Sequence, residues 1–297
     1  PTVITYNAAI SACSTCEEWR QAVHLFAEMR QHALELDTIT YNAAISAFER
    51  SEEWREALCL LADMEMSGLS PDVITYSALV RACPWPRALA VLAEMRRVSL
   101  QLDTLVCSAV MGACARAHQW LWALGVLSEV DQGGLERSEA IYHHVIFACA
   151  QTGRWELALK LLGEADEVGL VLDVVTYSAV ASACSSGQEP ERALQVFKAM
   201  GRRSLAPDVI ACNALIDACA KGGAQGQAFR AFEALLQQGL VPDVITYNTL
   251  ISTCAREGRP DQALEVLEAM RQQGLVPDVI TCSAVVSACS EGAHPHR

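Results

Sequence analysis

The chain has 297 residues, of which 52% are hydrophobic and 19% are charged, and its formal net charge is −13. No apolar run approaches the roughly 18 residues that a membrane-spanning helix needs, so the sequence predicts no direct membrane insertion. The acidic balance has the wrong sign for holding a polyphosphate chain by charge alone, because nonspecific nucleic-acid affinity comes largely from Lys and Arg.

A short phrase recurs along the chain at a fixed step. It begins at Val3 as Val-Ile-Thr-Tyr-Asn, and close copies begin at Thr38, Val73, Val174 and Val244. The step from Val3 to Thr38 is 35 residues. A fixed step of about 20 to 50 residues is typical of stacked units that bury their apolar faces against one another. The sequence therefore predicts a solenoid.

The repeats follow one another without a break. Eight are whole and the ninth is partial, with bounds 3–37, 38–72, 73–103, 104–138, 139–173, 174–208, 209–243, 244–278 and 279–297. Only the third is short, and its four missing residues fall between Cys83 and Arg87, where a turn between two helices is expected. The pattern indicates one elongated domain over residues 1–297. Pro1-Thr2 resembles the tail of an earlier repeat and the chain stops after half a repeat, so we expect that both ends are truncated.

Each repeat has the pattern of two helices joined by a turn, most clearly in residues 244–278. Apolar residues recur at helical spacing from Ile245 to about Arg256, and the turn Glu257-Gly-Arg-Pro260 ends in a Pro suited to the first turn of a new helix. The second helix then runs to a Gly stop at Gly274. At ~12 residues each, the helices are ~18 Å long and the short turn makes them antiparallel.

Aromatic and cysteine side chains recur at fixed places and are predicted to lie in the core. Trp19, Trp54 and Trp155 stand at the start of second helices, where packing is the expected role. Cysteine occupies the eleventh place of eight repeats, at Cys13, Cys83, Cys114, Cys149, Cys184, Cys219, Cys254 and Cys289. Equivalent atoms of neighbouring helices are about 8–10 Å apart, which exceeds the Cα separation of about 7 Å that a disulfide spans.

The remaining cysteines lead to the same interpretation. Cys107, Cys212 and Cys282 replace the Tyr of other repeats and are expected to pack as small hydrophobic groups. Cys13 and Cys16 form a lone Cys-x-x-Cys without a second pair at zinc-finger spacing, so no metal site is predicted. So many free thiols suit a reducing compartment.

The repeat resembles the pentatricopeptide repeat family, in its plain form of uniform length. The features that carry the resemblance are Val-x-Thr-Tyr-Asn at the head, Ala-Leu-x-x-Leu-x-x-Met in the second helix and Gly-Leu-x-Pro-Asp at the tail, which is complete at 68–72, 239–243 and 274–278. The tetratricopeptide repeat, with 34 residues and a different head, does not fit. The resemblance covers essentially the whole chain and implies an all-α, right-handed α-solenoid superhelix of antiparallel helix-turn-helix repeats.

The resemblance also implies single-stranded RNA binding, with one base read by each repeat. In the family the base is read by the fifth and the last residue of a repeat. Here these are Asn7 with Asp37, Asn42 with Asp72, Ser77 with Asp103, Ser108 with Ser138, His143 with Asp173, Ser178 with Asp208, Asn213 with Asp243, and Asn248 with Asp278. By resemblance Asn with Asp favours uracil, then cytosine, and Ser with Asp favours guanine. The expected target is near 5′-UUGNNGUU-3′, where the fourth and fifth pairs depart from the family pattern.

Two further sets of residues take roles from the resemblance. The second residue of each repeat would pack against the base, and these residues are Ile4, Ile39, Ile74, Leu105, Val175, Ile210 and Ile245, with a small Ala140 in the fifth repeat. Basic residues near the end of the first helix would lie by the RNA backbone, at Arg50, Arg116, Lys221 and Arg256. Simpler alternatives are interhelical packing for the apolar set, a solvated face for the basic set and helix capping for the Asp residues.

Two functions of different class remain open from the sequence. The first is a sequence-selective RNA-binding protein of a mitochondrion or chloroplast, acting in RNA processing, stability or translation. The second is a scaffold subunit of a large organellar ribosome or membrane complex, which the acidic balance and the irregular third to fifth repeats favour. No Gly-rich phosphate loop, nucleophile elbow or paired-carboxylate motif stands out, so no enzyme, cofactor or small-molecule substrate is predicted.

Overall fold

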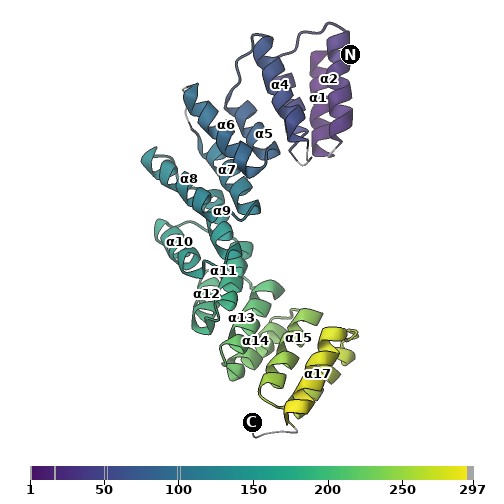
Figure 1. The fold of residues 1–297 in the computed structure, drawn as a ribbon, viewed down its shortest axis with the longest axis vertical. Coiled ribbons are helices and arrows are strands. Elements are labelled where there is room, and N and C mark those ends of the chain that lie inside the picture. Colours follow the sequence, from purple (N-terminus) through teal and green to yellow (C-terminus); the bar gives the residue numbers. More distant parts are fainter. Residues whose placement is uncertain are drawn as a thin grey trace. The chain divides into compact units, whose positions relative to one another are not determined.

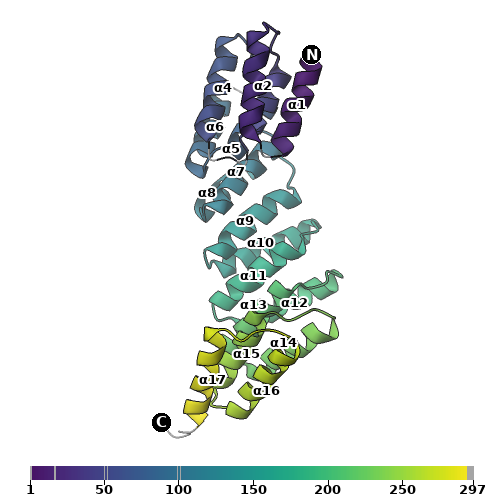
Figure 2. The same cartoon turned by 90° about the vertical axis from the view of Figure 1, so that its right-hand side faces the viewer.

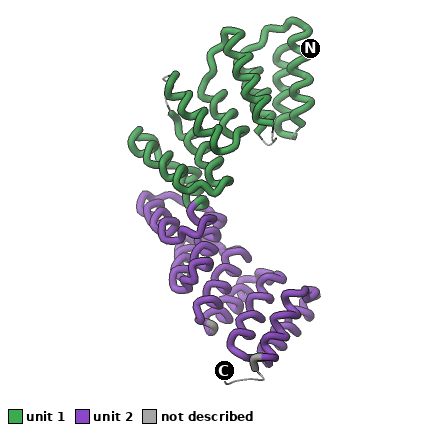
Figure 3. Tube along the Cα trace, viewed as in Figure 1, with its two compact units in different colours: residues 1–148 green, residues 149–297 purple. Residues whose placement is uncertain are grey.

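The structure is a computed structural model that describes residues 2–16, 18–49, 51, 53–98, 100 and 102–292. In this part the chain forms seventeen α-helices and no strand. Figures 1 and 2 show the helices from two sides. The chain divides into two compact units, unit 1 (Pro1–Ala148) and unit 2 (Cys149–Arg297), which Figure 3 colours separately. The boundary falls inside helix α9 (Glu139–Gln151). The sequence predicts one domain over residues 1–297, and this stays a prediction.

The first helix of every repeat begins at the residue where the sequence places the start of that repeat. These helices are α1 (Val3–Thr15), α3 (Thr38–Ser46), α5 (Val73–Ala82), α7 (Thr104–Arg116), α9 (Glu139–Gln151), α11 (Val174–Ser186), α13 (Val209–Lys221), α15 (Val244–Arg256) and α17 (Val279–Gly292). The second helices are α2 (Trp19–Gln31), α4 (Trp54–Met66), α6 (Trp85–Arg97), α8 (Trp120–Gln132), α10 (Trp155–Val168), α12 (Pro190–Arg202), α14 (Gln225–Gln237) and α16 (Pro260–Gln272). The predicted all-α repeat architecture is confirmed.

The tail residues of each repeat determine where the next first helix begins. Asp72 accepts a hydrogen bond from the backbone N–H of Thr75 at 2.8 Å, and the Thr75 hydroxyl accepts one from the backbone N–H of Asp72 at 3.1 Å. This reciprocal pair is a capping box, which satisfies two donors that a helix N-terminus leaves without partners. Gly274, with φ of +77°, ends the second helix of the eighth repeat in the left-handed conformation that glycine adopts without strain.

Within each unit the helices form two layers. Consecutive first helices pack directly on one another, from α1 to α7 in unit 1 and from α11 to α17 in unit 2, and second helices pack against the first helices of their own and the following repeats. Alanine at the fourth place of the second helix permits this close approach, because its side chain is fully buried at every one of these positions: Ala22, Ala57, Ala88, Ala123, Ala158, Ala193, Ala228 and Ala263. Buried tyrosines such as Tyr41 and Tyr177 fill the space between the layers.

The predicted core role is confirmed for most of the cysteines, whereas Trp19, Trp54 and Trp155 are only half-buried. In the eleventh place, Cys83, Cys114, Cys149, Cys184, Cys219 and Cys254 are buried, as are Cys107 and Cys212. Cys13 is half-buried, and Cys282 and Cys289 in the last repeat are exposed. Burial raises the pKa of the Cys114 thiol to about 11, so this group stays protonated and unreactive. Trp19 packs on Phe48 of the following repeat, with ring centroids 5.7 Å apart.

The third repeat is irregular at the place where the sequence is short. Helix α5 has 10 residues, whereas α7 has 13. The turn after α5 consists of Cys83 and Pro84 alone, and α6 begins at Trp85. The four missing residues thus shorten both the first helix and the turn, whereas the sequence placed the loss in the turn. In the described part of the chain, no helix is long and apolar enough to cross a membrane, and no three His, Cys, Asp or Glu side chains are placed to hold a metal ion.

Two glycines of unit 2 give a matched test of the packing between repeats. A Cβ added at Gly187 would lie 2.5 Å from the indole ring of Trp155, whereas one added at Gly163 in α10 would meet nothing within 4 Å. We expect Gly187→Ala to destabilise unit 2 by about 1–3 kcal/mol through overpacking. Gly163→Ala should stabilise it by about 0.5–1 kcal/mol, because alanine is the better helix former. Urea denaturation followed by circular dichroism measures both, and equal effects of the two changes would contradict the packing described.

Candidate functional site

One face of the first helices carries apolar side chains that are exposed to solvent. Ile4, Ile39, Ile74, Leu105, Val175, Ile210 and Ile245 are each between 53% and 81% exposed. They occupy the second place of their repeats, three residues before the fifth place, so the two positions share a helix face. Interhelical packing therefore does not explain this apolar set. We call the face that carries the second and fifth residues the inner face.

The fifth and last residues of a repeat meet on the inner face. The Asn42 amide Nδ2 donates to Asp72 Oδ1 at 3.2 Å. The same bond joins Asn213 to Asp243 at 3.1 Å and Asn248 to both carboxylate oxygens of Asp278 at 3.2 Å. These bonds connect residues 30 positions apart, so these three predicted pairs are brought together by the return of the chain through the second helix.

The first repeat has part of this arrangement. Asn7 Oδ1 accepts a hydrogen bond from the Thr40 hydroxyl at 2.8 Å. Asp37 caps α3, because its Oδ1 accepts from the backbone N–H of Thr40 at 2.8 Å. In the second and seventh repeats, Asp72 and Asp243 both cap the next helix and pair with Asn, so the two roles that the sequence left as alternatives coexist in one carboxylate.

A threonine from the following repeat completes each Asn pair. The Thr75 hydroxyl lies 2.7 Å from Asn42 Oδ1 and 2.8 Å from Asp72 Oδ1, so its single proton has two acceptors within reach. Asp72 Oδ1 already accepts from the Thr75 backbone N–H and from Asn42, and on that ground we assign the proton to Asn42 Oδ1. The Thr246 hydroxyl lies 2.6 Å from Asn213 Oδ1, and the Thr281 hydroxyl lies 2.5 Å from Asn248 Oδ1. Asn42, Asn213 and Asn248 are thus held at both ends of their amides.

These hydrogen bonds keep the carboxylates ionised. Burial raises the pKa of Asp72 and of Asp243, but the hydrogen bonds from Thr75 and Asn42, and from Thr246 and Asn213, outweigh burial, and both pKa values lie below the ordinary 3.8. For Asp278 the backbone N–H of Thr281 is the largest cause of a lowered pKa. At neutral pH each of these groups is an acceptor-only anion on the inner face.

Serine forms a different pair. The Ser178 hydroxyl lies 2.9 Å from Asp208 Oδ1 and 2.8 Å from the carbonyl oxygen of Val174, and its one proton serves one of these acceptors. Asp208 also caps α13 through the backbone N–H of Ala211 at 2.7 Å. The pair therefore offers only acceptors to a ligand, whereas an Asn pair keeps one N–H and one oxygen lone pair.

The predicted pairs of the third and fourth repeats are not joined in this way. The Ser77 hydroxyl is buried and has no hydrogen-bond partner, although Asp103 caps α7. Ser108 lies 3.4 Å from His144 Nδ1, and Ser138 accepts from the backbone N–H of Ile141 at 3.4 Å. Of the fifth pair, His143 belongs to unit 1, where it stacks on Phe147, and Asp173 caps α11 in unit 2.

The four predicted phosphate contacts differ in availability. Arg116 and Arg256 are exposed at the ends of α7 and α15, and neither has a hydrogen-bonding or ionic partner among the described residues. Lys221 donates to Asp217 at 2.6 Å, so its charge is already paired. Arg50 lies outside the described residues.

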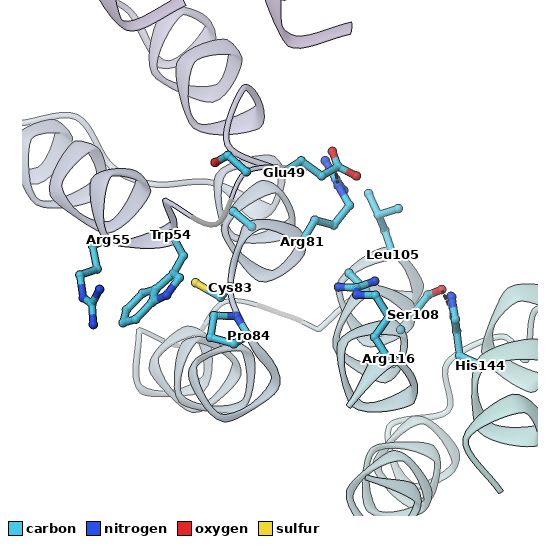
Figure 4. Close-up of a pocket in the computed structure, with 14 residues that line it drawn as sticks. Glu49, Trp54, Arg55, Arg81, Cys83, Pro84, Leu105, Ser108, Arg116 and His144 are labelled. Atoms are coloured by element: carbon cyan, nitrogen blue, oxygen red, sulfur yellow. Dashed lines mark hydrogen bonds and ion pairs between the residues drawn. The ribbon is translucent and has the colours of Figure 1, made fainter. Parts of the chain in front are cut away.

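A cleft of about 940 Å³ in unit 1 opens beside the shortened third repeat. Figure 4 shows Cys83 and Pro84 at one side, and Leu105, Ser108 and Arg116 at the other. Arg81 of α5 also lines it and donates to Glu49 at 3.0 Å. The cleft carries more basic than acidic charge, because Arg55, Arg81 and Arg116 face a single Glu49. A positively charged cleft on an acidic chain is a place where anions concentrate.

Three features of this site were not predicted from the sequence. Arg81 and His144 line the cleft without belonging to the predicted sets. Burial lowers the pKa of His144 to about 4, with help from His143 and Arg116, so its ring is neutral at pH 7. The third is the threonine that holds each Asn. The only sequence signal for it was the repeated Thr of the Val-x-Thr-Tyr-Asn head, which had no assigned role.

Solved structures share the fold. The pentatricopeptide repeat protein PPR10 from maize is 24% identical to this chain, with a TM-score of 0.60, and the alignment covers 99% of this chain and 48% of that one. The chain therefore spans about half the length of the maize protein. The PPR domain of Arabidopsis thaliana protein-only RNase P 1, solved in complex with tRNA, is 15% identical with a TM-score of 0.55, covering 61% of this chain and 95% of that one. No curated protein matches the chain in sequence.

Sequence profiles of repeat families match most of the chain. The PPR repeat family profile matches residues 1–48, 36–84, 207–256 and 242–291, and the pentatricopeptide repeat domain profile matches residues 125–186 and 160–223. The stretch between 84 and 125 is not covered, and it begins directly after the shortened turn. The repeat length, the paired helices and these matches agree, and the chain belongs to the pentatricopeptide repeat family.

Proposed function

We propose that this chain binds single-stranded RNA selectively, one base per repeat, through the inner face of its first helices. One observation carries this function: at four repeats a joined polar pair lies on the same helix face as a solvent-exposed apolar side chain. A base offers a matching surface, because its flat face is apolar and its edge is polar. The PPR domain solved with tRNA, which shares this fold, supports the same function.

The hydrogen-bond inventory fits the expected bases. An Asn pair keeps one donor and one acceptor, which complements the N3–H and the neighbouring oxygen of uracil. The Ser178 pair offers acceptors only, which complements the two adjacent donors of guanine, N1–H and N2–H₂. The strand would therefore be read as UU by the first two repeats and as GUU by the sixth to eighth, within 5′-UUGNNGUU-3′. No joined pair supports the first G of this sequence, because the Ser77 hydroxyl is not hydrogen-bonded to Asp103.

The acidic charge of the chain is compatible with this function. The paired Asp residues are held by donors and are used for bases, and Arg116 and Arg256 remain available for phosphates. We further propose that the chain acts without catalysis of its own in a mitochondrion or chloroplast, protecting, processing or enabling translation of a transcript that it covers.

A scaffold role in a large organellar assembly is the second candidate. The observation that favours it is the formal net charge of −13, together with the unjoined pairs in the third and fourth repeats. The exposed apolar residues of the inner face could then pack against protein. Indifference to RNA, together with tight binding of one protein partner, would identify this function.

The seventh repeat gives a direct test of base reading. Replacing both Asn213 and Asp243 by Ala should reduce the preference for U at position seven of 5′-UUGNNGUU-3′ by roughly 5- to 150-fold, corresponding to about 1–3 kcal/mol. Asn213→Ser, which keeps Asp243 and its cap on α15, should move the preference at that position towards G. Fluorescence anisotropy with oligonucleotides that differ only at position seven measures this. Preference at position two, read by Asn42 and Asp72, is the internal control. An unchanged base preference would contradict the assignment.

The salt dependence of binding tests the phosphate contacts. For single strands each neutralised phosphate contributes about −0.7 to the slope of log K against log salt concentration. Arg116→Ala and Arg256→Ala should each make the slope shallower by about 0.7, and Lys221→Ala should change it less because Asp217 already pairs with Lys221. Arg230→Ala, an exposed change on the second helix α14, should leave the slope unaltered. Equal effects of all four changes would rule out specific phosphate sites.

A further inference from the structure

Where the fifth residue of a repeat is Asn or Ser, the third residue of the next repeat varies with it; His143, followed by Thr176, is neither. Where the fifth residue is Asn, the third residue that follows is Thr, in the pairs Asn7 and Thr40, Asn42 and Thr75, Asn213 and Thr246, and Asn248 and Thr281. Where the fifth residue is Ser, the following third residue has no hydroxyl, in the pairs Ser77 and Val106, Ser108 and Ile141, and Ser178 and Ala211. The chain thus contains its own comparison between repeats.

The geometry explains this correlation. Asn is long enough for its Oδ1 to reach the hydroxyl of the next repeat, at 2.5 to 2.8 Å in the four pairs. The shorter Ser178 satisfies its hydroxyl with Asp208 and the Val174 carbonyl, and Ala211 at the third place presents nothing polar to it. Capping alone does not require Thr, because Asp208 caps α13 over Ala211 as Asp243 caps α15 over Thr246.

The threonine and the aspartate together fix which end of the amide faces which neighbour. The carboxylate, an acceptor, takes Nδ2. The Thr246 hydroxyl lies 2.6 Å from Asn213 Oδ1 and 2.8 Å from Asp243 Oδ1, and we assign its proton to the amide oxygen because Asp243 Oδ1 already accepts two N–H groups. The second N–H and the second lone pair of the amide are then presented in one fixed order. Uracil has its edge donor at N3 beside an acceptor at O4, and cytosine has the reverse, an acceptor at N3 beside a donor at N4. An amide held in one orientation can therefore distinguish the two pyrimidines, which an amide free to turn distinguishes poorly.

We propose that Thr40, Thr75, Thr246 and Thr281 are positioning residues that set the preference of the preceding Asn for uracil over cytosine. This inference rests on the proposed RNA binding and adds a third residue, from the next repeat, to each reading pair. The threonine does not touch the base. Its contribution appears in the ratio of affinities for uracil and cytosine at one position rather than in affinity as a whole.

The test uses the full chain and substitutions at Thr246, which holds Asn213. In Thr246→Val the ratio of affinities for U and C at position seven should fall roughly two- to tenfold, the effect of one lost hydrogen bond. The ratio at position eight, read by Asn248, should not change. Thr246→Ser keeps the hydroxyl and should retain the original ratio. Thr5→Val is the matched control, because Thr5 occupies the same place in the first repeat and contacts Thr2 instead of an Asn.

A second measurement on the free protein separates failure of this inference from failure of RNA binding. The chain contains only four asparagines, and each is the fifth residue of a repeat. Selective ¹⁵N labelling of asparagine therefore gives four side-chain amide signals, and hydrogen exchange of the Asn213 amide should be faster in Thr246→Val than in the unmodified chain. An unchanged exchange rate, or an unchanged ratio at position seven in a chain that binds its target, would overturn the positioning role. If the unmodified chain binds no RNA, the proposed function and the uracil preference both fail.

Discussion

The structure depends on one carboxylate that is used twice. The aspartate at the end of a repeat accepts the backbone N–H that starts the next first helix, at 2.8 Å for Asp72 and Asp243, and it also accepts the amide of the fifth residue of its own repeat. The cap fixes the carboxylate on the helix end, and the carboxylate in turn fixes the amide. The same short tail therefore sets the length of a repeat and the direction of its polar group. The contact that begins the next helix also builds the inner face.

This double use gives a structural role to part of the acidic charge of the chain. Burial works against ionisation of Asp72 and Asp243, yet donors surround each carboxylate and its pKa falls below the ordinary value. The negative charges at the repeat ends are thus compensated by dipoles and N–H groups rather than by Lys or Arg. Basic residues such as Arg116 are left without acidic partners, and the paired Lys221 shows the contrasting case in which a neighbouring Asp217 takes up the charge.

The repeat period alone predicted the helix starts, because a helix cap has a local sequence signature and the period places it. The same holds for the buried cysteines. The pairs of the second and sixth to eighth repeats were predicted from the family resemblance and not from the period. The isolated Ser77 hydroxyl could not be predicted, because its sequence position is equivalent to that of Ser178 and the difference arises from packing. The cleft beside Arg81 could not be predicted either, because it depends on how the helices pack around the four missing residues. The threonine contacts depend on the spacing between successive repeats, which no single repeat contains.

The central claim is that joined Asn and Asp side chains present a base-reading edge, and asparagine side-chain resonances in the RNA complex test it most directly. With selective ¹⁵N labelling, the four amide signals of Asn7, Asn42, Asn213 and Asn248 should all shift on addition of 5′-UUGNNGUU-3′. Replacing one uracil should return only the signal of its own repeat towards the free position, and polyadenine should move none of the four. Tight RNA binding that leaves all four amide signals unmoved would contradict the claim, because the strand would then lie on another surface of the chain.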